Sequence, residues 1–210
     1  MKTDDLIAAL AADTMPQAAP AARLWRGLPA AALVSLVALV VLWRVRPELD
    51  SVLTSYPVYK TAVPAVLALA ALWLGLALGR PGVAVRAPWV PLLAVLSGLG
   101  GALIYGLTTT SSAEVAALID TPDYTNCLIS IPVLAALPLA VTLWAMRAGA
   151  PAHPALSGAL AGTVAAGIGA AVYSLHCPND ALMYFFSAYG TSMLTVVAAG
   201  ALIGARLLRW

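Results

Sequence analysis

Two cysteines and one histidine are the side chains of this chain best suited to chemistry. The 210 residues include only two cysteines, Cys127 and Cys177, and His176 and Asp180 flank the second one in "HCPND". Thiolates can be oxidised, and sulfur, imidazole and carboxylate ligands together suit a thiophilic metal ion. No close-spaced ligand motif accompanies them, so the pattern by itself is a weak indication of a metal site.

The composition excludes an ordinary soluble domain. Hydrophobic residues make up 62% of the chain and charged residues 10%, with a mean hydropathy of +0.92, whereas soluble domains carry about 25% charged residues. Roughly 20 residues of helix cross a hydrocarbon core, so each long uncharged run can hold one span. We therefore predict an all-α integral membrane protein, a bundle of six transmembrane helices. The runs cover residues 27–43, 61–79, 87–113, 124–146, 148–179 and 181–205.

The distribution of basic residues predicts the orientation of these helices. Three of the eleven Lys and Arg residues, Arg44, Arg46 and Lys60, fall in the first outer loop. The other eight lie on the side that holds both termini. Because basic residues accumulate on the cytoplasmic side, we predict that both termini are cytoplasmic. The net charge of +2 then reflects topology and does not indicate nucleic-acid binding.

Several classes of protein lack support in the sequence. No Asp, Glu, Lys or Arg falls in the middle of a predicted span, which argues against ion-coupled transport. There is no phosphate loop, dinucleotide fingerprint or serine elbow, so we expect neither an enzyme nor a bound cofactor. Two alternatives stay open. A small-molecule transporter or channel subunit would need a polar path, and a membrane thiol oxidoreductase would normally need a Cys-x-x-Cys pair and a quinone or haem.

In this topology the two cysteines lie on the same, outer face of the bundle. Cys127 begins the fourth span and Cys177 lies between the fifth and sixth. They could be small buried apolar residues, or a permanent disulfide in an oxidising compartment. They could also be a sensor pair, in which oxidation or a soft metal links two loops and shifts the helices. The metal version uses Cys127, His176 and Cys177, with Asp123 or Asp180 completing the site.

The chain divides into a water-facing tail, residues 1–26, and a six-helix domain, residues 27–210. Acidic residues near the start argue against a cleaved signal peptide, so we expect the tail to be retained. Two pairs of glycines spaced four apart predict close helix approaches, and internal packing is a better explanation for them than dimerisation. These pairs are Gly158 with Gly162 and Gly200 with Gly204.

The tail contains the pattern of a short binding helix. Thr3 can cap its start, two carboxylates suit the positive first turn, and three apolar side chains form one stripe. A helix of about 12 residues is marginal alone in water, so it should order against a partner. We expect a protein groove with a basic rim, and a tail without a partner is the alternative. The proposed contact residues are Asp4, Asp5, Leu6, Ile7 and Leu10.

The start "TDDLIAAL", the segments "CLISIPVLAALPLA" and "MRAGAPAHPALSGALAG", and "HCPND" followed by "YG" together resemble a known family. With six spans they are similar to the NrsF-like membrane anti-sigma factors, the negative regulators of sigma F. The resemblance implies that the tail sequesters an extracytoplasmic-function sigma factor at the inner membrane. It also implies that Cys127 and Cys177 perceive oxidants or metals. It leaves the oligomeric state open.

Overall fold

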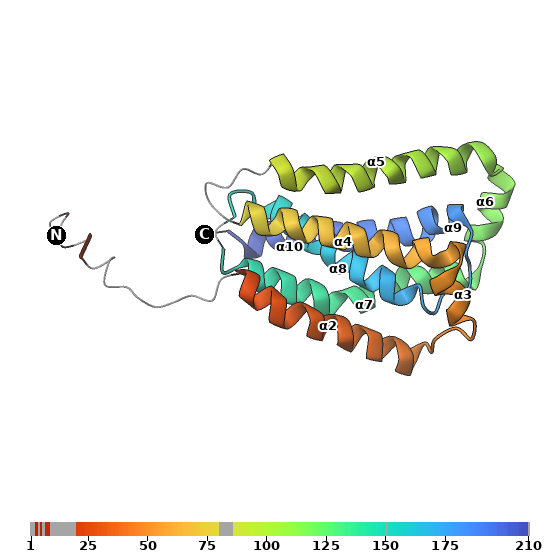
Figure 1. The fold of residues 1–210 in the computed structure, drawn as a ribbon, viewed down its shortest axis with the longest axis horizontal. Helices are drawn as coiled ribbons and strands as arrows, with labels where there is room; N and C mark the ends of the chain where they lie inside the picture. The colour runs from red at the N-terminus through yellow and green to blue at the C-terminus, as the bar shows by residue number, and fades with distance from the viewer. Residues whose placement is uncertain are drawn as a thin grey trace.

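The computed structural model of this protein describes residues 20–79, 86–149 and 151–209, together with Thr3, Asp5, Ile7 and Ala8 near the start. Within these residues there is no β-strand, and six helical segments are long and apolar enough to cross a membrane. They lie roughly parallel in an elongated bundle (Figure 1). The all-α bundle with six candidate spans is therefore confirmed. The segments are α2 Pro20–Leu42, α4 Tyr59–Leu78, α5 Arg86–Thr109, α7 Pro122–Met146, α8 Pro154–Tyr173 and the composite Leu182–Leu207.

Short elements gather at one end of the bundle, on the right of Figure 1. The segment α6 begins with a capping box, in which the Ser111 hydroxyl accepts from the Glu114 backbone N–H and the Glu114 carboxylate accepts from Ser111. The sixth span contains a π-helical segment, η2, between two α-helical pieces. These elements are α3 Leu49–Thr54, η1 Tyr56–Val58, α6 Ser112–Ile119, α9 Leu182–Tyr184 and η2 Phe185–Gly190, and the long helix α10 Thr191–Leu207 completes the sixth span.

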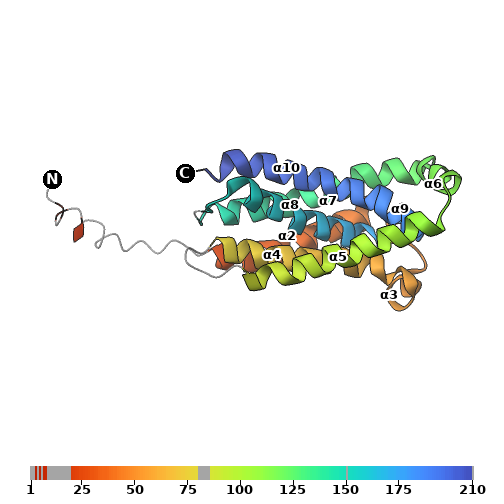
Figure 2. The same cartoon turned by 90° about the horizontal axis from the view of Figure 1, so that it is seen from above.

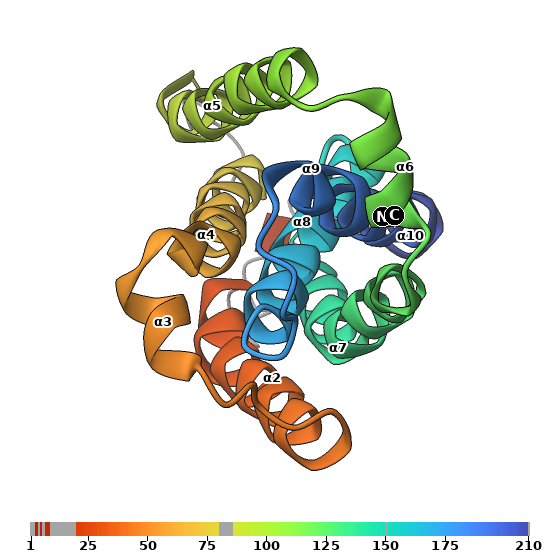
Figure 3. The same ribbon diagram turned by 90° about the vertical axis from the view of Figure 1, so that its right-hand side faces the viewer.

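Helix α8 occupies the centre of the bundle (Figure 3). It is the most buried of the six candidate spans and packs against α4, α7 and α10. Its glycines allow the backbones to approach closely, because a Cβ on Gly158 would collide with the Gly200 carbonyl oxygen. A Cβ on Gly162 would lie 2.8 Å from the Val196 carbonyl oxygen. The glycine pairs thus serve internal packing, as the sequence predicted.

Helix α5 lies at the periphery, as Figures 2 and 3 show. It is the least buried of the six candidate spans and contacts mainly α4 and α9. A Cβ on Gly98, Gly100 or Gly101 would meet nothing within 4 Å. Large apolar side chains such as Leu93 and Ile104 are exposed along it. Such a surface is compatible with lipid and unfavourable in water.

The helix boundaries differ from the sequence prediction in two places. Helix α2 begins at Pro20, upstream of the expected start near Gly27, because proline is favoured in the first turn of a helix. Lys60, which we placed in a loop, lies in the first turn of α4 and is 1% exposed. The predicted tail helix is described only at Thr3, Asp5, Ile7 and Ala8, which are helical. Asp4, Leu6 and Leu10 lie outside the described residues.

The first residue of α2 and the last residue of α10 lie at the same end of the bundle (Figure 1), as an even number of spans requires. We call this the tail end. The opposite end carries α3, α6 and α9 together with both cysteines, and we call it the thiol end.

Candidate functional site: a buried thiol pair

The two cysteines lie side by side at the thiol end. Cys127 is in the second turn of α7, and Cys177 is in the turn that follows α8. Their sulfur atoms are 4.0 Å apart, and both residues are 0% exposed. A disulfide bond would bring the sulfurs to about 2.05 Å, so these are two free thiols in contact. The proximity expected from the sequence is therefore present, while the role in sensing stays a prediction.

Three tyrosines line the thiol pair. The Tyr184 hydroxyl is 3.2 Å from the Cys127 sulfur, and Tyr173 and Tyr189 are also almost completely buried. The Tyr189 hydroxyl interacts with Cys177 but makes no hydrogen bond of good geometry among the described residues. Because burying a polar group without a partner is costly, this hydroxyl marks the surroundings of the thiols as imperfectly satisfied.

The turn that carries Cys177 is held to α4 by one buried ammonium group. Lys60 Nζ donates to the carbonyl oxygens of Cys177 at 3.0 Å and Asn179 at 2.6 Å. It also donates to Asp180 Oδ1 at 2.9 Å. A lysine ammonium has three N–H donors, so this set satisfies all of them. The buried charge is compensated by two backbone dipoles and by the carboxylate of Asp180, which Lys60 shares with Arg46.

Arg46, in the loop after α2, binds the same turn from another direction. Its Nη1 donates to the Cys177 carbonyl oxygen and to Asp180 Oδ1, both at 3.2 Å, and its backbone N–H donates to the Leu175 carbonyl at 3.0 Å. Burial raises the pKa of Asp180, but hydrogen bonds from Lys60 and Arg46 outweigh this effect and set the pKa below its usual value. Asp180 therefore stays ionised at neutral pH.

The electrostatics of the turn also act on its thiol. The Cys127 thiol, which donates to the Cys177 sulfur, is the main cause that lowers the pKa of Cys177, and the charge of Lys60 adds to it. Burial opposes both. Because the thiolate is the reactive form of cysteine, Cys177 is the better nucleophile of the pair.

The predicted metal set is not assembled as a group. His176 Nδ1 lies 2.9 Å from the Arg44 carbonyl oxygen, and because a carbonyl can only accept, this nitrogen carries the proton. No group of three or more His, Cys, Asp or Glu side chains with ligand geometry occurs in the part of the chain that the structure describes. The set of Cys127, His176 and Cys177 stays a prediction from the sequence, and only its two sulfurs lie in contact.

Lys60, Arg46 and the three tyrosines were missed as parts of the site. A lysine next to an apolar run normally indicates a loop or an interfacial residue. The signal that could have drawn attention to Lys60 is its position between aromatic residues and a span, in "SYPVYKTAVP". Its burial depends on Asp180, which no local pattern connects to it.

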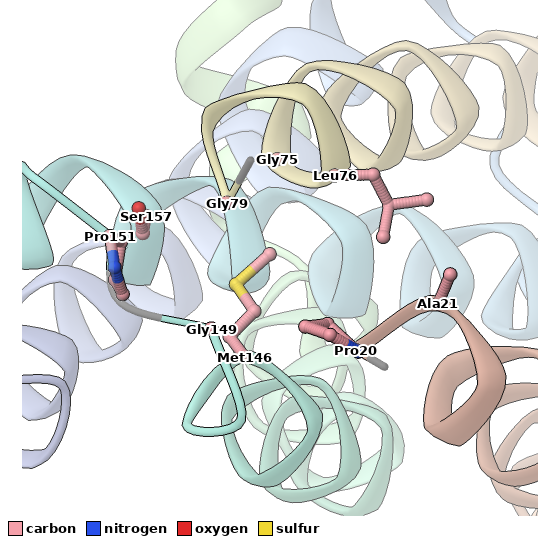
Figure 4. A pocket seen from close by; sticks show the side chains of 9 residues that line it. All are labelled: Pro20, Ala21, Gly75, Leu76, Gly79, Met146, Gly149, Pro151 and Ser157. Atoms are coloured by element: carbon pink, nitrogen blue, oxygen red, sulfur yellow. The ribbon is translucent and has the colours of Figure 1, made fainter. Parts of the chain in front are cut away.

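The tail end holds a small cavity next to the start of α2. Its volume is about 60 Å³. The Met146 side chain points from α7 toward α4 (Figure 4), and a Cβ on Gly75 would lie 2.8 Å from its terminal methyl carbon. A Cβ on Gly149 would lie 3.4 Å from Pro20. The start of α2 at Pro20, which we call the root of the tail, thus packs on the ends of α4 and α7.

Comparisons with known proteins agree with the resemblance seen in the sequence. The family model described as negative regulator of sigma F matches residues 9–210. The chain belongs to the NrsF family. It is 33% identical over 218 residues to the anti-sigma-F factor NrsF of Caulobacter vibrioides, with both chains covered completely. It is also 33% identical over 216 residues, again with complete coverage, to the probable anti-sigma-F factor NrsF of Azospira oryzae.

Both relatives are regulators and not enzymes, which agrees with the expectation from the sequence. No solved structure matches this chain. Membership of the NrsF family therefore identifies the chain as an anti-sigma factor, and the thiol pair is the part of this fold with the most evident chemistry.

Proposed function

We propose that this protein is a membrane-bound anti-sigma factor that holds an extracytoplasmic-function sigma factor with its N-terminal helix and releases it when Cys127 and Cys177 react. The family supports the anti-sigma activity. The observation that carries the sensing step is the contact of the two buried thiols at 4.0 Å. Nearly all other polar groups of the thiol end have partners, so a reaction there must disturb an ordered network.

The bundle spans the bacterial inner membrane in this proposal, with both termini in the cytoplasm. Six long apolar helices and their exposed apolar side chains support the insertion. The excess of basic residues at the tail end supports the orientation. The thiol end then faces the periplasm, where oxidants and metal ions from outside arrive first.

The tail supplies the binding surface for the sigma factor. Leu6, Ile7 and Leu10 enter an apolar groove of the partner, and Asp4 and Asp5 face its basic rim. Ile7 is 59% exposed, so its side chain is available for such a contact. Burying one Leu or Ile side chain contributes about 1.5–3 kcal/mol, which makes the stripe the main source of affinity.

Oxidation of the pair is a two-electron exchange with a low-molecular-weight disulfide. The Cys177 thiolate attacks one sulfur of that disulfide and expels the first small thiol. The Cys127 thiolate then attacks the Cys177 sulfur and expels the second. One protein disulfide forms, the reagent is reduced to two thiols, and the protons of the two cysteines pass to those thiols.

A soft metal ion is the second candidate stimulus. With metal–sulfur bonds of about 2.3 Å in a tetrahedral site, two sulfurs lie roughly 3.8 Å apart. The observed 4.0 Å is close to that value. Binding would release the two thiol protons into water, and the two sulfur atoms would need to move only slightly to coordinate the ion. This favours a thiophilic ion over a hard, oxygen-seeking one.

Helix α7 connects the reaction to the tail. It carries Cys127 near one end and Met146 at the other, and it packs along α2. The Ser35 hydroxyl on α2 donates to the Leu134 carbonyl of α7 at 2.8 Å. A displacement of α7 at the thiol end therefore reaches the first turn of α2. The coupling needs a few kcal/mol to release most of the bound sigma factor.

The test isolates the tagged full-length protein in lipid nanodiscs with its co-purified sigma factor. We expect an oxidising disulfide reagent to release the sigma factor from the wild type and not from a Cys127→Ser/Cys177→Ser variant, which should still bind it. Exchange of Leu6, Ile7 and Leu10 for Ala should prevent binding without any oxidant. Normal release of the sigma factor by the double Ser variant would refute the sensing role of the two cysteines. Full affinity of the triple Ala variant would refute the role of the tail as the binding surface.

A further inference from the structure

Lys60 is a buried cation whose hydrogen-bond partners all belong to one turn. The three oxygen atoms that it contacts come from Cys177, Asn179 and Asp180. The residue is 1% exposed. An ammonium group removed from water needs both hydrogen bonds and an opposite charge, and here both come from residues 177–180.

Because of this arrangement, Lys60 keeps its three hydrogen bonds only while the 177–180 turn lies against α4. If residues 177–180 moved away from α4, the ammonium would lose every acceptor that it has among the described residues. Cys177 belongs to the same four residues, its sulfur contacts that of Cys127, and the residue is 0% exposed. The position of the turn therefore decides both whether Lys60 is satisfied and whether Cys177 is accessible.

We propose that Lys60 is a latch that holds the 177–180 turn closed over the thiol pair, so that Cys177 reacts with an outside reagent only when the turn leaves Lys60. This inference rests on the proposed thiol sensing and adds the residue that sets its threshold. Lys60 touches neither the reagent nor the sulfur through its hydrogen bonds. It is a positioning residue that acts through the backbone of the turn. Its charge also helps to lower the pKa of Cys177, and Lys60→Met removes this effect, which by itself would slow labelling.

The other contacts of the turn are weaker candidates for this role. Arg46 also forms a salt bridge with Glu48, whose side chain is 77% exposed. If the turn opened, the Arg46 guanidinium would still have this carboxylate as a partner. Tyr59 makes one hydrogen bond, from its hydroxyl to the Asp180 carbonyl oxygen at 3.1 Å. Outside the turn, the charge of Lys60 meets the Tyr189 ring, with 5.7 Å from Nζ to the ring centroid, but no carboxylate among the described residues. A distant aromatic ring does not replace three hydrogen bonds and an ion pair, so Lys60 is the strongest restraint on opening.

The inference is tested by the rate at which a membrane-impermeant maleimide labels Cys177 in the full-length protein in nanodiscs. Mass spectrometry identifies which cysteine carries the label. We expect slow labelling of the wild type, because labelling requires opening, and at least tenfold faster labelling of Cys177 in Lys60→Met. Methionine keeps the length and the apolar stem of lysine, so the change removes the donors and the charge with little loss of packing.

Two further variants separate the latch from simpler explanations. Leu74→Ala removes a fully buried side chain from the same helix and should destabilise the bundle without exposing Cys177. Lys60→Met combined with Asp180→Asn removes the whole Lys60–Asp180 ion pair, while Arg46 keeps Glu48 as a carboxylate partner. We expect this double variant to label as fast as Lys60→Met.

The possible outcomes each decide the question. Labelling of Lys60→Met at the wild-type rate overturns the latch, as does equal acceleration by Leu74→Ala, which would indicate general loosening. Wild-type labelling of the double variant also overturns it, because Lys60 would then only neutralise Asp180. If labelling behaves as expected but sigma release no longer depends on the cysteines, the latch stands and the proposed sensing fails.

Discussion

The two ends of the bundle are held together by different kinds of contact. At the thiol end, charged and polar groups fix the Cys177 turn through directed hydrogen bonds from Lys60 and Arg46. At the tail end, helices meet through small residues, and a Cβ on Gly204 would lie 2.5 Å from the Cα of Gly158. A cavity of about 60 Å³ lies beside the start of α2 there.

The difference in contacts indicates that the two ends of the bundle suit different functions. Directed hydrogen bonds have few alternative arrangements, so the thiol end should respond to a chemical change in an all-or-none manner. Contacts between small apolar groups tolerate small shifts, and Met146 borders free volume into which its flexible side chain can move. The thiol end is thus suited to detection, and the tail end to adjusting the root of the tail.

The largest effect should come from removing the anion of the thiol end. Asp180→Asn leaves Lys60 and Arg46 without their shared carboxylate. We expect a loss of about 3 kcal/mol in the free energy of unfolding, the low end for a broken buried pair, because the Asp180 side chain is 27% exposed. Chemical denaturation in detergent measures it. The matched control Glu48→Gln should change stability by less than about 1 kcal/mol, since that side chain is 77% exposed.

Acid should weaken the thiol end through the same carboxyl group. The pKa of Asp180 is lowered in the folded protein, so its contribution is fully present above the unfolded value of about 4 and is lost as the pH falls through the folded value. Stability measured between pH 7 and pH 2 should fall less steeply in Asp180→Asn than in the wild type. Identical acid profiles would show that the carboxylate does not stabilise the turn.

A smaller, pH-independent effect is expected at the tail end. In Gly204→Ala the new Cβ meets the backbone of Gly158, which cannot move aside as a flexible side chain would. We expect a loss of about 1–3 kcal/mol from overpacking. Gly101→Ala on α5 is the control, because a Cβ there meets nothing within 4 Å. Equal losses in the two variants would contradict the close packing of α8 against α10.

The smallest change should come from Gly75→Ala. Its Cβ would lie 2.8 Å from the terminal methyl carbon of Met146, but that methyl can move into the neighbouring cavity. We expect a change in stability within about 1 kcal/mol, because better helix propensity offsets the shift of Met146. A loss as large as that of Gly204→Ala would mean that the tail end is more rigid than its cavity suggests.

The sequence predicts those features that depend on composition and on positions near in the chain. The six uncharged runs each correspond to one long helix, because length and hydropathy decide what can cross a membrane. The contact of Cys127 with Cys177 follows from the order of the spans, which places both at the same end. The glycine pairs correctly indicated close packing within one chain.

Features that depend on distant partners were not accessible in this way. Lys60 was assigned to a loop because a charge ends an apolar run, yet its burial is made possible by oxygens of the turn after α8. Arg23 of α2 rests over the Trp144 ring of α7, with 4.9 Å from Cζ to the ring centroid, and no local pattern connects these two residues. His176 belongs to the metal alternative left open by the sequence, and no local pattern predicted the contact of its ring with the Arg44 carbonyl oxygen.

The burial of Lys60 also has a consequence for the order in which the protein is made. Its three acceptors follow it in the chain by 117 to 120 residues. At about 5–20 residues per second, the ribosome needs roughly 6–24 s to synthesise that length. In the proposed membrane orientation, the ammonium stays at the membrane surface during this interval, because an unpaired charge is costly inside the bilayer. The contacts of Lys60 at the thiol end can therefore form only after the fifth long helix, α8, and the turn that follows it have been synthesised.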